Sequence, residues 1–132
     1  MRRILYAFAP LAVVAACAGS GSAPTGVAQQ PAAQVVTMTA DLKYSPAAVT
    51  VDAGQTVEFR NVSNFAQNVS TEADTPAELQ VALMPTGAVP FNSGEIAPNE
   101  SFRQTFSVPG TYRYFSEANV SEGMIGTVIV NP

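Results

Sequence analysis

The segment Pro109 to Val130, PGTYRYFSEANVSEGMIGTVIV, predicts two β-strands joined by one loop. A Pro-Gly turn signal precedes the β-prone residues 111–115, and the apolar run Thr127–Val130 follows the loop. Tyr112 and Tyr114 are two residues apart, so they point to the same face of their strand. The spacing of the loop between the strands is typical of a metal-binding loop. Met124, however, is the one residue of this loop that could bind a soft metal.

Short β-prone runs alternate with turn residues from Val35 onward, which predicts an all-β, antiparallel sandwich. In the strand that follows the expected turn at Asp52–Gly54, Val57 and Phe59 are expected on one face, with Glu58 and Arg60 on the other. A bulge or change of face is expected near Phe102, Thr105 and Phe106. The strands are expected within 35–42, 48–51, 56–59, 101–108, 111–115 and 127–130, among about seven strands in one domain of residues 35–132.

One segment departs from the β pattern and predicts a short helix over residues 76–84. Thr75 is a suitable N-cap, Pro76 occupies the first helical position, and Glu78 stands three residues after the cap. Pro85 and Gly87 end the helix. Leu79, Ala82 and Leu83 lie on one apolar stripe of this helix.

The first sixteen residues have the pattern of a signal peptide. Arg2 and Arg3 precede an apolar run at 4–16 that is too short for a permanent membrane span. Val14-Ala15-Ala16-Cys17 resembles the bacterial lipobox, in which the cysteine becomes the lipidated first residue. An ordinary signal peptide is the alternative. The lipobox interpretation makes Cys17 an acyl attachment point and the membrane a partner through the lipid anchor.

Residues 17–34 continue with small, polar and proline residues and no charge, which predicts a flexible tether. A tether of this length reaches roughly 20–25 Å. The expected location is the bacterial cell envelope. Ala18 after the cysteine favours the outer membrane in a Gram-negative host.

Composition restricts the chemistry of the chain. There are ten acidic and six basic residues, and loss of Arg2 and Arg3 would leave a net charge of −6, which argues against nucleic acid as a partner. The chain has no histidine and one cysteine. No Ser-His-Asp or Cys-His arrangement is possible, and we do not expect an enzyme.

Three segments together resemble the cupredoxin family, the plastocyanin and azurin type of blue copper proteins. The first is residues 44–59, with Ser-Pro before a strand and Ala-Gly at the turn. The second is residues 91–114, with Ser-Gly, Ala-Pro, a phenylalanine strand and Pro-Gly-Thr-Tyr. The third is residues 114–130. The resemblance covers nearly all of 38–131 and implies a Greek-key β-sandwich with one short helix.

The same resemblance places copper ligands at four positions of this chain. Gln67 occupies a histidine position, Ser116 the cysteine position, Asn119 the second histidine position and Met124 the axial methionine position. A blue copper site needs two imidazoles and a thiolate, with methionine as a long axial ligand. We therefore expect no type 1 copper site and no cofactor, with copper as the alternative.

Three alternatives remain for what these residues do. In the first, Gln67, Ser116 and Asn119 hydrogen-bond one another and the nearby backbone. In the second, oxygen atoms of this loop hold a hard cation. In the third, two thioethers hold cuprous copper. The second alternative uses Ser116, Glu117, Asn119 and Glu122, and the third uses Met84 and Met124.

The sequence thus predicts a lipid-anchored, cupredoxin-like domain that acts as a binding or structural module. The rival function is that of a plastocyanin-like protein that carries electrons or handles copper. By analogy with the fold, a protein partner is expected at the apolar loop end. The residues of this expected docking patch are Phe65, Ala66, Pro90, Phe91, Val120 and Ile125.

Overall fold

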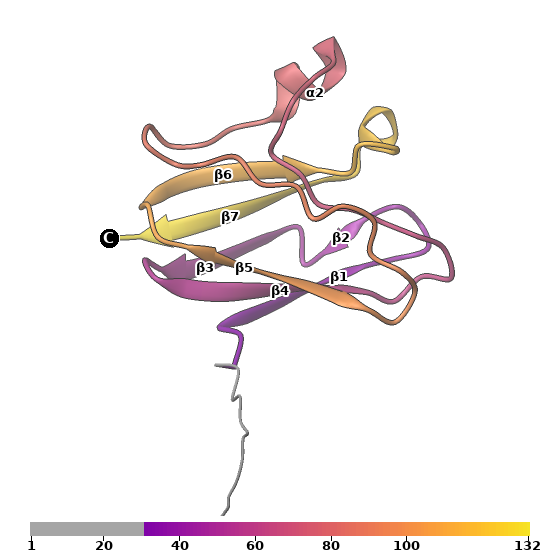
Figure 1. Cartoon of the computed structure of the whole chain (residues 1–132), viewed down its shortest axis with the longest axis horizontal. Coiled ribbons are helices and arrows are strands. Elements are labelled where there is room, and N and C mark those ends of the chain that lie inside the picture. Colours follow the sequence, from indigo (N-terminus) through magenta and orange to yellow (C-terminus); the bar gives the residue numbers. More distant parts are fainter. Residues whose placement is uncertain (1–30) are drawn as a thin grey trace, which may run out of the picture. The chain divides into compact units, whose positions relative to one another are not determined.

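The computed structural model describes residues 31–132, so the predicted signal peptide, Cys17 and most of the predicted tether lie outside the described residues. The described chain forms two β-sheets packed face to face (Figure 1). One sheet has the order β2-β1-β4-β5 and the other has the order β3-β7-β6. The strands are β1 (Gln34–Met38), β2 (Tyr44–Ser45), β3 (Ala48–Asp52), β4 (Gln55–Asn61), β5 (Ser101–Phe106), β6 (Gly110–Phe115) and β7 (Ile125–Asn131).

The expected all-β sandwich with one short helix is confirmed, but its sheets are mixed rather than antiparallel throughout. β1 pairs in parallel with β4, and β3 pairs in parallel with β7. β6 and β7 form the antiparallel pair that residues 109–130 predict, with Tyr114 opposite Gly126. These pairings bring the two ends of the 116–124 loop together at one end of the sandwich.

Two details of the strands differ from expectation. The run 35–42 is not one strand, because the chain turns after Met38, with Leu42 N–H donating to the Thr39 carbonyl at 3.1 Å. β5 contains no bulge, since its pairing with β4 is continuous. Phe102, Gln104 and Phe106 therefore alternate regularly with the other residues of β5.

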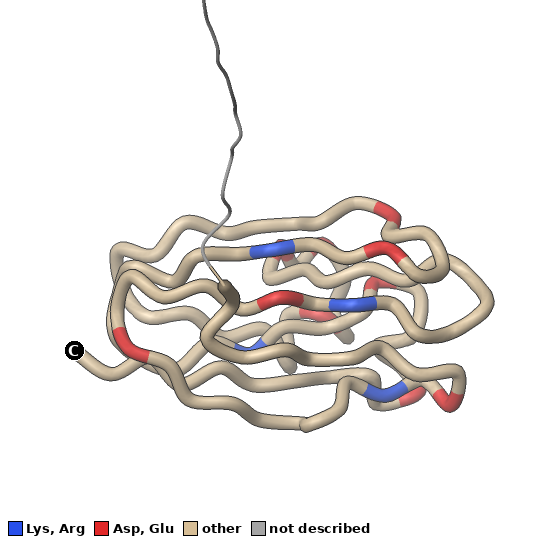
Figure 2. The backbone as a smooth tube through the Cα atoms, turned by 90° about the horizontal axis from the view of Figure 1, so that it is seen from below, with Lys and Arg blue, Asp and Glu red and all other residues tan. Residues whose placement is uncertain are grey.

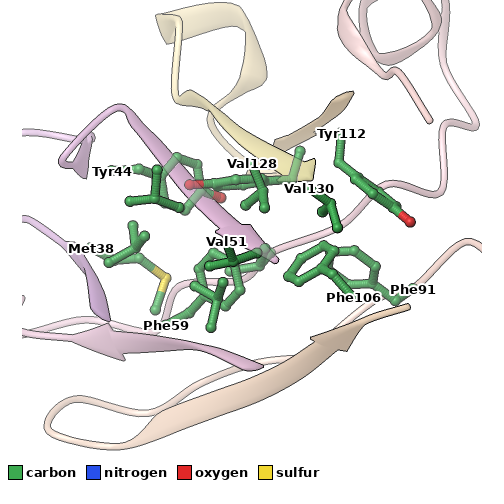
Figure 3. Close-up of a cluster of buried hydrophobic side chains, with 14 of the residues drawn as sticks. Met38, Tyr44, Val51, Phe59, Phe91, Phe106, Tyr112, Val128 and Val130 are labelled. Carbon is green, nitrogen blue, oxygen red and sulfur yellow. The ribbon is translucent and has the colours of Figure 1, made fainter. Parts of the chain in front are cut away.

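Aromatic rings connect the two sheets in the core (Figure 3). Phe59 of β4 meets Tyr114 of β6 edge-on, with ring centroids 5.1 Å apart. Phe106 of β5 meets Tyr112 of β6 at 4.9 Å. The expected shared face of Tyr112 and Tyr114 is thus confirmed, and both rings are buried. Edge-to-face contacts of this kind add about 0.5–1.5 kcal/mol each beyond the area that they bury.

The helix α2 (Pro76–Val81) is shorter than predicted, although its predicted start is correct. Thr75 Oγ1 accepts the Glu78 N–H, and the Glu78 carboxylate accepts the backbone N–H of Thr75 and Asp74 at 2.9 and 2.8 Å. The expected stripe is incomplete, because Ala82 and Leu83 lie beyond the end of the helix. Leu79 is 67% exposed and Leu83 is 41% exposed.

The chain leaves the helix early because its backbone finds another partner. Ala82 is already extended, and Leu83 exchanges two backbone hydrogen bonds with Arg113 on the edge strand β6. Helix α2 accordingly lies beside β6 in Figure 1. No helix among residues 31–132 is long and apolar enough to cross a membrane.

Candidate functional site

The loop end of the sandwich carries the four residues singled out from the sequence. Gln67 lies in the long connection between β4 and α2, and Ser116 directly follows β6. Asn119 is the N-cap of the 3₁₀ helix η3 (Val120–Glu122), and Met124 directly precedes β7. Ser116, Asn119 and Met124 therefore all lie in the loop between β6 and β7.

Three of these residues contact one another. Asn119 Nδ2 donates to Ser116 Oγ at 3.3 Å and lies 3.9 Å from Met124 Sδ. The backbone closes the same loop, because Ser116 N–H donates to the Met124 carbonyl and Met124 N–H donates to the Asn119 carbonyl. Ser116 and Met124 are buried. This part of the expected polar network is present.

Gln67 bonds nearby backbone, as the first alternative expected, but it does not hydrogen-bond Ser116 or Asn119, so that part of the expectation was wrong. Its Nε2 donates to the Thr39 carbonyl at 3.1 Å and to Ser63 Oγ at 3.4 Å. Its backbone forms a bridge with Ile96. The side chain of Gln67 is directed toward the turn after β1, because its amide finds an acceptor there in the Thr39 carbonyl.

Asn61 fixes the start of the connection that carries Gln67. Its Nδ2 donates to the carbonyls of Phe65 and Ile96 at 2.7 and 2.9 Å, and its Oδ1 accepts from the backbone and hydroxyl of Ser63. Asn61 is fully buried. Both polar atoms of its amide are thus used to hold two loops against each other.

Asn68 makes a second contact between loops, with Glu117. Its Oδ1 accepts the backbone N–H of Glu117 at 2.8 Å, and its carbonyl accepts the hydroxyl of Tyr44 at 2.7 Å. Burial raises the pKa of Tyr44 well above its usual value, and Tyr114 and Glu117 raise it further. Tyr44 is therefore a neutral donor that holds the 67–68 segment in place.

A cavity of about 410 Å³ opens between three loops at this end of the molecule. Its wall includes two of the predicted site residues, Gln67 and Ser116. Sequence reasoning missed most of the other lining residues, because asparagine and glutamate in turn-rich segments carry no positional pattern. The cavity is lined by Ala66, Gln67, Asn68, Asn92, Gly94, Glu95, Ser116, Glu117 and Ala118.

The hard-cation alternative finds little support in the geometry. Glu117 Oε2 accepts from Asn92 Nδ2 at 2.6 Å, across the cavity loops, and Glu122 is exposed on η3. Within the described range, no three side chains of His, Cys, Asp or Glu gather as metal ligands do.

The cuprous-copper alternative involves Met84 and Met124. Met84 is half-buried and packs against the core, which also contains Met124.

Only some residues of the expected docking patch are exposed at the surface. Phe65 is 37% exposed, and Ala66 and Pro90 are exposed. Phe91, however, is buried, with its ring stacked on Phe102 at 6.2 Å. Its inclusion in the patch was wrong, because the aromatic core continues from β5 beneath this loop. Val120 and Ile125 are half-buried.

Comparison with known proteins identifies the class that this two-sheet fold and loop end define. The family of copper binding proteins of the plastocyanin/azurin type matches residues 31–131. The chain belongs to this plastocyanin/azurin family, as its sequence resemblance suggested.

Individual relatives agree with this assignment. The plastocyanin of Tetradesmus obliquus is 34% identical over 133 residues, which cover 98% of this chain and 88% of that protein. The chloroplastic plastocyanin of Oryza sativa subsp. indica is 35% identical over 91 residues, 68% of this chain. That match spans only 56% of the rice protein.

Solved structures show the same fold. A pseudoazurin from Sinorhizobium has a TM-score of 0.59 at 26% identity, covering 75% of this chain and 73% of that one. The Cu(I) form of an amicyanin mutant has a TM-score of 0.60 at 23% identity, covering 78% of this chain and 86% of that one. The cupredoxin-type fold is therefore shown.

The residues at the four ligand positions of the resemblance do not fit the copper of that family. They supply two amides, a hydroxyl and a thioether, whereas a blue copper centre takes two imidazoles and a thiolate. The full chain contains no histidine that could replace them, and its one cysteine is Cys17, far from Ser116 in the sequence.

Proposed function

We propose that this chain is a cupredoxin-fold domain that forms no type 1 copper site and acts as a binding or structural module at the cell envelope. The observation that carries the proposal is the donor set. Asn119 and Ser116 hydrogen-bond each other at 3.3 Å, and the Gln67 amide is engaged with Thr39 and Ser63. Neutral amides and hydroxyls in such bonds are poor competitors for copper against water.

Copper reconstitution tests this proposal. We expect the protein, incubated with Cu(II) and then dialysed, to retain less than stoichiometric copper and to show no intense absorption at about 600 nm, where thiolate-to-copper charge transfer is seen in His₂Cys centres. Elemental analysis of protein purified from its own host gives the second readout. Stoichiometric copper with a blue band would establish the rival function, electron transfer or copper handling as the plastocyanin relatives suggest.

The proposed location rests on the sequence of the first seventeen residues. We infer that Cys17 carries the lipid and that the domain is held at the membrane surface by the anchor. Cys17→Ser should move the protein from the membrane fraction to the soluble fraction, while Cu(II) titrations remain unchanged. Membrane retention of the variant would refute the anchor without affecting the copper result.

No catalytic role is part of the proposal. The described residues have few basic positions, which lie among acidic ones in Figure 2, and we do not propose nucleic acid as a partner. The binding end that we propose is the loop end, where Phe65 and Ala66 are exposed beside the cavity-lining residues.

A further inference from the structure

The charged residues of the described chain are divided unequally between its strands and its connections. The connections at the loop end, counted with helix α2, contain one lysine and eight acidic residues, a net charge of −7. The strands contain three arginines and two acidic residues, a net charge of +1. The acidic residues of the connections lie within the segments 39–43, 62–78, 92–100 and 116–124.

The topology places these acidic segments at one end of the sandwich. Gln67 donates to the Thr39 carbonyl in the first segment and forms a backbone bridge with Ile96 in the third. Ser70 forms bridges with Asn92 and with Phe115, which directly precedes the fourth segment. Figure 2 accordingly shows most of the acidic positions toward the end opposite the marked C-terminus. The loop end is therefore strongly acidic.

The described chain enters the domain at the opposite end of the sandwich. Ala33 N–H donates to the Thr56 carbonyl near the start of β4 at 2.8 Å. Gly54 N–H donates to the Phe106 carbonyl, where β5 ends, at 2.7 Å. We call this the entry end, and it comprises the start of β1, the turn 52–54 and the connection 107–110. Asp52 is the one charged side chain that the described residues place there.

The two ends are far enough apart to respond differently to a charged surface. The seven-residue strand β4 spans about 23 Å between them. The potential of an anionic lipid surface decays over about 8 Å at physiological ionic strength. Only the end that faces the lipid therefore senses the surface. Turning the loop end toward the lipid would bring a net charge of −7 close to it, whereas the entry end brings one carboxylate.

We propose that the anchored domain directs its entry end toward an anionic lipid surface and its loop end away from it. The tether that the sequence predicts joins the domain at the entry end, so this orientation does not require the chain to pass around the sandwich. The loop end, with its cavity and the exposed Phe65, is then open to a partner on the side away from the membrane. This inference rests on the proposed anchor and adds the direction in which the domain presents its binding end.

Paramagnetic relaxation in lipid nanodiscs tests the orientation. The chain of residues 17–132 is labelled with nitrogen-15 and coupled through its one cysteine to a maleimide lipid, so the test does not depend on lipidation by the host. A lipid that bears gadolinium broadens the amide signals of residues close to the surface. The orientation ratio is the broadening at Gly54 and Ser107 divided by the broadening at Gly94 and Ala118.

The composition of the discs separates the effect of charge from the effect of the tether. We expect the orientation ratio to be at least about fivefold higher in discs that contain phosphatidylglycerol than in discs of phosphatidylcholine alone, since each charge near an anionic surface changes a population about fivefold. In about 1 M salt the Debye length is only about 3 Å, so the two kinds of disc should give the same ratio.

Two variants make the same change of charge at opposite ends of the domain. Glu122 and Asp52 are both exposed. Glu122→Gln removes a negative charge from the loop end, so it should lower the ratio in anionic discs by about two- to fivefold. Asp52→Asn removes a negative charge from the entry end, so it should raise that ratio by a similar factor.

Three results would overturn the inference. They are equal ratios in the two kinds of disc, a ratio in anionic discs that salt does not lower, and shifts in the same direction for Glu122→Gln and Asp52→Asn. Amide spectra without gadolinium show whether each variant is folded, and if one is not, the comparison of discs with the unchanged sequence still decides. Failure leaves the proposed lack of a copper site intact, and Cys17→Ser tests the anchor separately.

Discussion

At the scale of single residues, two neighbouring buried tyrosines differ in whether their hydroxyls have a hydrogen-bond partner. Tyr44 and Tyr114 lie edge to face, with ring centroids 4.7 Å apart. The Tyr44 hydroxyl donates to the Asn68 carbonyl at 2.7 Å, whereas the Tyr114 hydroxyl is buried with no partner among residues 31–132. Burial raises the pKa of both phenols, so both hydroxyls stay protonated at neutral pH.

The first prediction compares these two tyrosines. Tyr114→Phe removes an unpaired hydroxyl, so it should raise the free energy of unfolding by about 1 kcal/mol. Tyr44→Phe removes a donor and leaves the Asn68 carbonyl unpaired, so it should lower that free energy by about 1–2 kcal/mol. Urea unfolding followed by circular dichroism measures both. Equal destabilisation by the two substitutions would contradict the assignment of partners.

Gln67 gives the second residue-scale prediction. Gln67→Leu is close in volume but removes the donor to the Thr39 carbonyl and to Ser63 Oγ. We expect the free energy of unfolding to fall by about 1–2 kcal/mol, because these acceptors lose their partner. Thermal melting measures the change. An unchanged melting temperature would show that Gln67 fills space only.

At the scale of elements, local sequence decides where α2 begins and tertiary contact decides where it ends. The capping box of Thr75 and Glu78 formed as its sequence signature predicted. Its C-terminal end was not predictable from the apolar spacing, since Leu83 pairs with the backbone of Arg113 on β6. A strand edge with free backbone groups competes with the last helical turn.

The third prediction follows from the pKa of Glu78. The hydrogen bond from the Asp74 backbone, together with those from Thr75, lowers this pKa from its usual 4.5, against an opposing effect of burial. A lowered folded-state pKa stabilises the fold above the unfolded pKa, and that contribution is lost as the pH falls below about 4.5 toward the folded pKa. Glu78→Ala should therefore cost about 1 kcal/mol at pH 7 and much less near pH 3.

The matched control for Glu78 is Glu72→Ala, which changes an exposed glutamate in the same connection. Because its side chain is exposed, its effect on unfolding at pH 7 should be small. Unfolding curves at a series of pH values test the pair. A cost for Glu78→Ala that stays constant down to pH 3 would mean that the carboxylate charge does not contribute to the cap.

In the β6–β7 pair, a tertiary contact explains why a glycine stands within a strand. Gly126 stands opposite Tyr114, and a Cβ atom there would lie 2.3 Å from the phenol oxygen. This glycine is required for the close approach of the ring and not for a turn conformation. Spacing alone could not indicate this, because a glycine inside a strand fits several explanations.

At the scale of the whole molecule, the sandwich has a continuous apolar core of its own. Buried hydrophobic side chains extend through both sheets, from Val36 on β1 to Val130 on β7. The loop end, where the family resemblance places the copper ligands, is closed by Asn61, Asn68 and the Ser116–Asn119 pair. The bonds of Asn61 and Asn68 join separate loops, whereas the Ser116–Asn119 bond closes a single loop.

The fourth prediction therefore concerns metal removal. The melting temperature should be the same, within about 1 °C, in the presence of excess chelator and in its absence. A protein whose native state binds a metal is stabilised by that metal to an extent that rises with its affinity. Differential scanning calorimetry gives the comparison. A fall of several degrees on chelation would reveal a structural metal that the donor set does not suggest.

Much of the fold could be predicted because its signals are local. The turn at Asp52–Gly54 and the alternation of Val57 and Phe59 follow from neighbouring residues, whereas no local signal showed that this turn joins strands of different sheets, β3 and β4. For the site, the sequence indicated several of the residues but not how they are arranged in space. Its cavity is formed by segments 66–68, 92–95 and 116–118, and no local pattern links the first to the second.

The sequence by itself determined the class of the protein and its lack of imidazole donors, because the β pattern is periodic and the lack of histidine is a matter of composition. Only the tertiary structure decided how the remaining polar groups pair. It turned Gln67 toward Thr39, buried Phe91, and left Asn68 Nδ2 and Gln67 Oε1 buried without a hydrogen-bond partner among residues 31–132. The physical reason is that a hydrogen bond depends on which atoms the packed sheets bring within about 3 Å, and spacing along the chain does not fix that distance.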